Sequence, residues 1–116
     1  MNKHNGAKWL PRKKRLALYA RDGFACAYCG TSDKLSLDHL VPRIKKRGHN
    51  GQTNLITACV TCNQRKGDRP WKAFVGCGEK IAHINRLRRR TIKPHLLWAL
   101  SVLKENDWPT ALEMKE

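Results

Sequence analysis

The chain has 116 residues, which is enough for one compact domain and too few for two independent ones. Its 24 Lys and Arg residues outnumber 9 Asp and Glu, and the formal charge of +15 favours nucleic acid over a membrane surface as the partner. The longest apolar run, LLWAL at 96–100, is too short to cross a bilayer, and no apolar signal segment is visible. We therefore expect a cytoplasmic, non-secreted protein that does not bind membranes.

The first section of the chain, residues 1–25, predicts one helix. Pro11 suits a first helical turn, Leu16 and Tyr19 can share one apolar face, and Gly23 can end the helix. The polar start of the section gives no further motif.

The second section, residues 26–69, carries most of the residue types used in chemistry. It begins with a cysteine knuckle and continues in a strand over residues 35–39 and a long basic loop, RIKKRGHNGQTN. A second short strand, NLITAC, then turns directly into a helix predicted over residues 60–66. The pattern is that of a small two-stranded unit with a helix after its second strand.

The third section, residues 70–116, is predicted to be helical, with helices near residues 79–90 and over about residues 94–106. The first of these helices has a narrow apolar stripe formed by Ile81, Ile84 and Leu87. Its remaining positions are basic, and a solvated face and a phosphate-contacting face fit that pattern equally well. Three leucines of the second helix are expected in the core: Leu96, Leu100 and Leu103.

Four of the five cysteines form two CxxC pairs, Cys26 with Cys29 and Cys59 with Cys62. Two such knuckles can supply a closed tetrahedral set of thiolates, which is typical of structural Zn²⁺. The 29 residues between the pairs exceed a usual zinc-ribbon gap, so a substantial insertion is predicted there. The alternative, four buried cysteines that act as small apolar residues, is weaker because the two pairs match. Cys77 lies outside both pairs and is interpreted as an idle thiol.

The inserted segment places an acid and a histidine together at the end of the first strand, in LSLDHLVPR. An ionised carboxylate among leucines is costly unless it is paired, and a metal ion is the partner predicted for Asp38. Asn63 follows Cys62 at the start of a helix, and its amide oxygen with the Asp38 carboxylate can hold a hard divalent cation. His39 would then lie beside the cation, without binding it, and take a proton from water. Successive side chains of a strand point to opposite faces, so Asp38 and His39 converge only if the strand ends or bulges there.

Three segments together resemble the HNH endonucleases of the ββα-metal type, in the subclass with four zinc-binding cysteines: RDGFACAYCG, LSLDHLVPR and TNLITACVTCNQRKGDR. The resemblance covers about residues 12–70. It implies an α+β fold with a small ββα-metal core and two zinc knuckles, flanked by an N-terminal helix and C-terminal helices. The expected organisation is a single domain, 1–116, with the HNH core at 12–70 and a helical extension at 71–116.

The resemblance also implies a role for each polar residue of the core. His39 matches the first His of the family name and would activate water, and Asn54 matches the middle Asn, which would tie down the loop and orient His39. Asp38 and Asn63 would bind a catalytic Mg²⁺ or Mn²⁺, while the cysteines hold structural Zn²⁺. Asn63 occupies the final His position, a departure that is expected to change metal preference more than activity.

The implied reaction is hydrolysis of DNA phosphodiester bonds, by nicking or by double-strand cleavage, that leaves 5′-phosphate and 3′-hydroxyl ends. Six basic residues are candidates for phosphate contacts: Lys45, Lys46, Arg47, Arg65, Lys66 and Arg69. A small HNH protein of this kind also resembles those encoded by phages and mobile elements.

Two other functions stay open at this point. One is a zinc-stabilised nucleic-acid-binding module without catalysis, and the other is an accessory of a nucleoprotein machine. A homodimer or a larger nucleoprotein assembly stays open as well, because one active site per chain cuts one strand at a time.

Overall fold

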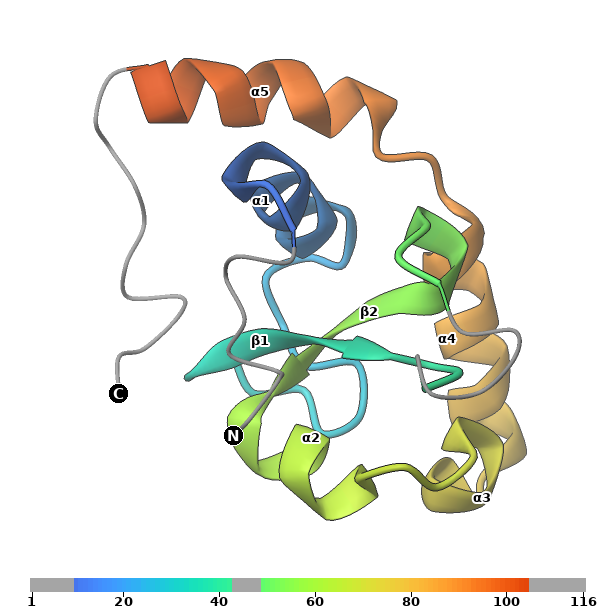
Figure 1. Ribbon diagram of the computed structural model, residues 1–116. Helices are drawn as coiled ribbons and strands as arrows, with labels where there is room; N and C mark the ends of the chain where they lie inside the picture. Colours follow the sequence, from blue (N-terminus) through green and yellow to red (C-terminus); the bar gives the residue numbers. More distant parts are fainter. Residues whose placement is uncertain (1–9, 43–48, 105–116) are drawn as a thin grey trace.

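The computed structural model describes residues 10–42 and 49–104 of the chain (Figure 1). It is a mixed α+β structure in which helices surround an antiparallel pair of strands, and the predicted fold class is therefore confirmed. None of the helices in the described ranges is long and apolar enough to cross a membrane.

The elements follow the chain in a simple order. They are α1 (Arg12–Arg21), β1 (Leu35–His39), the 3₁₀ helix η3 (Gln52–Asn54), β2 (Leu55–Cys59), α2 (Val60–Lys66), α3 (Trp71–Val75), α4 (Gly78–Arg89) and α5 (Lys93–Lys104). The bounds of β1 and α2 are those expected from the sequence, and α4 and α5 each begin one residue earlier than expected. The short helices η3 and α3 were not predicted. Residues 105 and 106, predicted to continue the last helix, lie outside the described residues.

The two strands pair in a continuous antiparallel register from Leu35 opposite Cys59 to His39 opposite Leu55. His39 and Cys59 therefore lie at opposite ends of the ribbon. No bulge interrupts the pairing in the described strands, so Asp38 and His39 sit at successive positions where β1 ends. Because regular alternation sends neighbouring side chains to opposite faces of a sheet, the two side chains can converge here only through the end of the strand at His39.

The sheet lies between two helical layers, with α1 and then α5 on one side and α2 on the other (Figure 1). Apolar side chains of α1 and both strands are buried, and because successive strand residues face opposite ways they form the core on both faces of the sheet. The principal members of this core are Leu16, Leu18, Leu35, Leu37, Leu55 and Ile56. Their removal from water is the main stabilising contribution of a domain this small.

A buried ion pair joins the end of α1 to the second strand. Arg21 pairs with Asp22 at 2.7 Å and donates further hydrogen bonds to the carbonyls of Gln52 and Leu55 at 2.8 and 2.7 Å. The Asp22 carboxylate accepts the backbone N–H of Thr57 at 2.8 Å. Because the polar atoms of the pair have hydrogen-bond partners, the pair can be tolerated in the interior and fixes where β2 begins.

The apolar faces of the last two helices follow the prediction only in part. Ile84 and Leu87 of α4 are buried, as expected. On α5, however, Leu100 is 47% exposed, and the fully buried residue is its neighbour Ala99. The reason is that α5 packs mainly on one other helix, α1, so only a narrow stripe is covered and Leu100 lies beside that stripe. Leu96 is half-buried.

Candidate zinc site and active site

The four paired cysteines come together at the end of the sheet where β2 runs into α2. Their sulfur atoms all lie within 4.8 Å of one another, and the Sγ atoms of Cys29 and Cys59 are 3.8 Å apart. A tetrahedral zinc ion with Zn–S bonds of about 2.3 Å separates its sulfur ligands by about 3.8 Å. The cluster therefore fits a metal ion such as zinc.

Backbone groups prepare these sulfurs to act as thiolates. The N–H groups of Tyr28 and Cys29 point at Cys26 Sγ, at 3.3 and 3.4 Å, and Cys62 N–H points at Cys59 Sγ at 3.4 Å. Burial is the largest cause that raises the pKa of the Cys62 thiol, and repulsion from the Cys26 sulfur is the second. A cation at the centre of the cluster would oppose both effects and favour the thiolates.

The Asp38 carboxylate is buried beneath α2, and its partners belong to the chain itself. The Tyr28 hydroxyl donates to Asp38 Oδ2 at 2.6 Å, and Lys66 Nζ lies 3.3 Å from Oδ2 and 3.5 Å from Oδ1. Burial raises the pKa of Asp38, and the Lys66 ammonium and the Tyr28 hydroxyl oppose that shift. Asp38 thus has Lys66 and Tyr28 as partners within the chain, and its role as a metal ligand stays a prediction.

Lys66 does not fit the predicted phosphate contact, because it is 1% exposed. Besides Asp38, its ammonium donates to the carbonyl oxygens of His39 at 3.1 Å and Gly67 at 3.4 Å. On α2 the buried positions are Cys62, Asn63 and Lys66, which share one face of the helix. Lys66 therefore belongs to the packed junction of α2 with β1.

Asn63 lies on the same face of α2, one turn before Lys66. Its Nδ2 donates to Ser36 Oγ at 3.0 Å and to the Leu37 carbonyl at 3.1 Å, which places the side chain against β1 next to Asp38. Its Oδ1 is buried and has no hydrogen-bond partner among the described residues. A buried amide oxygen without a protein partner is uncommon, and an ion or an ordered water is the usual explanation. Together with the Asp38 carboxylate, this oxygen suits a hard divalent cation.

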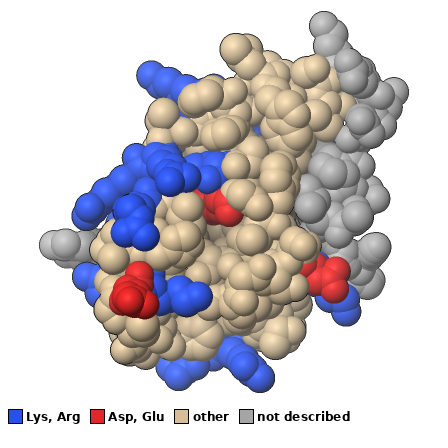
Figure 2. All heavy atoms as spheres, turned by 180° about the vertical axis from the view of Figure 1, so that it is seen from behind, with Lys and Arg blue, Asp and Glu red and all other residues tan. Residues whose placement is uncertain are grey.

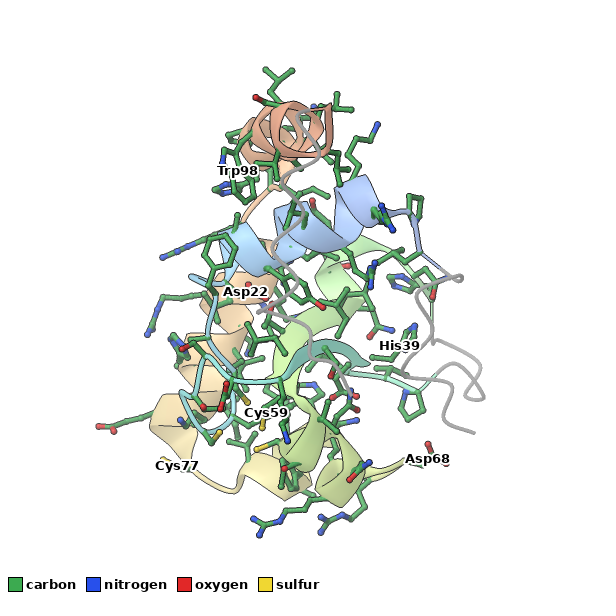
Figure 3. The ribbon with its side chains drawn as sticks, turned by 90° about the vertical axis from the view of Figure 1, so that its left-hand side faces the viewer. Asp22, His39, Cys59, Asp68, Cys77 and Trp98 are labelled. Atoms are coloured by element: carbon green, nitrogen blue, oxygen red, sulfur yellow. The ribbon has the colours of Figure 1, made fainter. Side chains whose placement is uncertain are left out.

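His39 is the last residue of β1, at the end of the sheet away from Cys59 (Figure 3). Its Nε2 lies 2.8 Å from the Asn50 side-chain oxygen Oδ1. With an amide oxygen as the acceptor, Nε2 is the nitrogen that donates, and the neutral ring then has its basic lone pair on Nδ1. Asn50 thus orients the ring of the proposed base.

The Asn54 side chain ties together the two chain segments that meet beside His39. It accepts the backbone N–H of Val41 at 2.8 Å and donates to the carbonyls of Val41 and His49, both at 2.9 Å. The Asn54 carbonyl accepts the N–H of Leu40 at 2.9 Å. Asn54 therefore acts on the backbone that follows His39, whereas the contact with the His39 ring comes from Asn50.

The basic residues predicted to contact phosphate fall into three groups. Lys45, Lys46 and Arg47 lie outside the described residues. Arg65 and Arg69 are exposed at the end of α2, where Arg69 donates to the Arg65 carbonyl at 2.7 Å. Lys66 is the buried residue described above.

The end of α4 carries a further group of basic residues, which we name the α4 arginine cluster: Arg86, Arg88, Arg89 and Arg90. Arg88 is anchored by a hydrogen bond from its Nε to the Thr53 carbonyl at 2.7 Å. Burial, with repulsion from Arg89, lowers the pKa of Arg88. Figure 2 shows Lys and Arg side chains gathered together on the side of the molecule where α4 lies. This concentration of positive charge suits a polyanion.

The sequence did not predict that Tyr28 contacts Asp38 or that Asn50 contacts His39. It also assigned Lys66 to the surface, whereas Lys66 is buried. The helical period could have placed Lys66 on the buried face of α2 with Cys62 and Asn63. No comparable signal identifies Tyr28 or Asn50, because their partners are 10 and 11 residues away along the chain.

Comparison with known proteins agrees with the resemblance seen in the sequence. Residues 26–69 match the family model described as HNH endonuclease, which confirms the resemblance to that family over this part of the chain. The matched range contains both cysteine pairs and all the polar residues of the candidate site.

Two curated relatives are CRISPR-associated endonucleases Cas9. The one from Actinomyces naeslundii is 32% identical over 88 residues, which is 66% of this chain and 8% of that protein. The one from Corynebacterium diphtheriae is 41% identical over 54 residues, 44% of this chain and 5% of that protein. The chain thus spans less than a tenth of the length of these relatives. No solved structure matches it significantly.

Proposed function

We propose that the protein is a divalent-metal-dependent endonuclease that hydrolyses DNA phosphodiester bonds. The observation that carries the proposal concerns Oδ1 of Asn63. It has no hydrogen-bond partner within residues 10–42 and 49–104, and it is buried at the α2–β1 junction where the Asp38 carboxylate also lies. The HNH domain match, the endonuclease names of both relatives and the charge of +15 support the same function. The cysteine cluster, which leaves no open ligand position, would hold a structural Zn²⁺.

In the proposed reaction His39 is the general base. Asn50 holds Nε2, and Nδ1 takes a proton from the water that attacks phosphorus. Asn54 keeps the backbone beside His39 in place through its bonds to Val41. A Mg²⁺ or Mn²⁺ ion held by Asp38 and Asn63 would polarise the scissile phosphate and stabilise the charge that develops in the transition state.

The ends of the product test this chemistry. Attack by water with departure of the 3′ oxygen leaves a 5′-phosphate and a 3′-hydroxyl. A supercoiled plasmid incubated with the full chain and Mg²⁺ should yield an open-circular form that DNA ligase reseals directly. Nicks that ligase cannot reseal would contradict the proposed direction of bond cleavage.

A non-catalytic nucleic-acid-binding module is the second candidate, and one observation favours it. The Asp38 carboxylate already has a cation beside it, because Lys66 Nζ lies 3.3 Å away and both groups are buried. A site neutralised in this way does not need a metal ion for its stability. Cleavage and binding must therefore be measured on the same sample.

Asn63→His tests the metal ligand set. Oxygen donors suit Mg²⁺ and Mn²⁺, whereas an imidazole suits Ni²⁺ and Co²⁺. The variant should lose nicking activity in Mg²⁺ and gain relative activity in Ni²⁺ or Co²⁺, while its zinc content stays the same. Metal-activity profiles of the two proteins at one pH provide the measurement, and coinciding profiles would exclude Asn63 as a ligand.

The salt dependence of DNA binding tests the α4 arginine cluster. Removing one phosphate-binding side chain should reduce the slope of log K against log salt concentration by about 0.9, because fewer counterions are released on binding. A variant with Arg86, Arg89 and Arg90 changed to Gln should therefore bind duplex DNA more weakly and with a flatter slope than the wild type. Arg88 is retained because it anchors η3. An unchanged slope would show that these arginines do not contact phosphate when DNA is bound.

A further inference from the structure

We propose that Tyr28, a residue of the first zinc knuckle, is a positioning residue for the candidate metal-binding site: its hydroxyl holds the Asp38 carboxylate in the orientation needed to bind a divalent cation. This inference rests on the proposed function, since it assigns Asp38 to the cation. It links the two metal sites of the domain through one side chain.

The contact between Tyr28 and Asp38 has the geometry of a strong hydrogen bond. The hydroxyl lies 2.6 Å from Oδ2 in a buried setting. O–H groups that donate to an ionised carboxylate lie at about 2.5–2.7 Å, and such bonds are roughly twice as strong as neutral ones. The hydroxyl is therefore a specific partner of one carboxylate oxygen.

The knuckle holds the tyrosine in place. Tyr28 lies between Cys26 and Cys29, and its own N–H points at Cys26 Sγ at 3.3 Å. Next to it, Ala27 N–H donates to the Thr57 carbonyl of β2 at 2.9 Å. The ring packs edge-on against Phe74 of α3, with centroids 5.2 Å apart and planes at 86°. A ring fixed on both sides presents its hydroxyl at a fixed point over β1.

Asp38 needs such a fixed donor because Lys66 competes for the same carboxylate. Lys66 Nζ is within 3.5 Å of both carboxylate oxygens, and it comes from the same face of α2 as Asn63. Without the hydroxyl, the side-chain partner left to the carboxylate among the described residues is the Lys66 ammonium, beside the backbone N–H of His39, and the carboxylate can turn toward that ammonium. The Tyr28 hydroxyl binds Oδ2, so Oδ1 has the weaker hydrogen bonds of the two carboxylate oxygens. Oδ1 is therefore the oxygen suited to a cation.

The effect should appear in cation affinity. Hydrogen-bond partners of metal ligands typically contribute about 10- to 100-fold to metal affinity or activity. Tyr28→Phe removes the hydroxyl and keeps the ring against Phe74, so the dissociation constant for Mn²⁺ should rise about 10-fold or more. The zinc content should not change, because the cysteines are retained, and phenylalanine fills the place of the tyrosine ring in the core.

The experiment measures Mn²⁺ binding to the full zinc-loaded chain by electron paramagnetic resonance, together with zinc content and plasmid nicking. Thr57→Val is the matched control, since it removes another buried hydroxyl of the same sheet, one whose bond goes to the Leu18 carbonyl at 3.4 Å. This control should bind Mn²⁺ as the wild type does. Phe74→Ala is a second variant that keeps the hydroxyl but frees its ring, and a smaller loss of affinity is expected.

The outcomes separate the inference from the proposed function. Equal Mn²⁺ affinity of wild type and Tyr28→Phe, at equal zinc content, overturns the positioning role even if the wild type nicks DNA. A wild type that binds Mn²⁺ but never nicks contradicts the proposed function, and the two affinities still decide the role of Tyr28. A wild type that binds no Mn²⁺ overturns both. If Tyr28→Phe does not fold, unchanged affinity in Phe74→Ala overturns the inference.

Discussion

Replacement of His39 by alanine is expected to slow plasmid nicking about 10²- to 10⁴-fold, the usual effect of removing a general base. His39 is the proposed proton acceptor, and its ring is oriented by Asn50 at the end of β1. It is not a proposed ligand of either metal site. Zinc content, Mn²⁺ affinity and DNA affinity should therefore remain close to those of the wild type.

The matched control for this variant is His83→Ala, since His83 is an exposed histidine on α4 and is not part of the candidate site. Single-turnover nicking rates in Mg²⁺, with DNA binding measured on the same preparations, give the comparison. If His39→Ala and His83→Ala nick at the same rate as the wild type, His39 has no part in the reaction.

The second large effect concerns the cysteine cluster. Structural Zn²⁺ contributes about 10–16 kcal/mol of apparent binding free energy in small zinc domains, which is comparable to the whole stability of a domain. Cys59 ends β2 and its sulfur accepts the N–H of Cys62 at the start of α2. Cys59→Ser should therefore abolish cooperative thermal unfolding, followed by circular dichroism, and expose the chain to proteases.

Cys77→Ser is the control for that experiment, because Cys77 is exposed and lies outside the metal cluster. It should unfold at the temperature of the wild type and retain its zinc. A wild-type protein that is purified without zinc, yet unfolds cooperatively, would contradict the structural role of the cluster.

Local patterns predicted the individual elements at the centre of this fold because each element is encoded by residues close together in the sequence. The alternation of Leu35, Ser36 and Leu37 indicates a strand, and the two CxxC pairs predict that four cysteines gather at one point. Both features are found in the structure. The helix that contains Cys62 begins and ends where expected, with Cys59 as its cap. The sequence signal of each feature lies in residues that are close together in the chain, although the two cysteine pairs meet only in the folded structure.

The pairing of side chains across elements could not be predicted in the same way. The helical period could have placed Lys66 on the buried face of α2, but its partner Asp38 is defined only by the packing of α2 on β1. Tyr28 reaches Asp38 because the knuckle folds back over the sheet. Whether Leu100 is buried depends on how many elements cover α5, and α1 alone leaves it exposed. Such outcomes depend on tertiary contacts that no local pattern records.

The measurement that tests the proposed function most directly follows binding and cleavage of one supercoiled plasmid in the same reaction. The full zinc-loaded chain is incubated with the plasmid in a chelator that spares the cysteine-bound zinc, and Mg²⁺ is then added in excess. We expect the DNA to be bound throughout and to convert to the open-circular form only after Mg²⁺ is added. DNA that stays bound and supercoiled in Mg²⁺ and in Mn²⁺ would contradict the nuclease and identify the protein as a binding module.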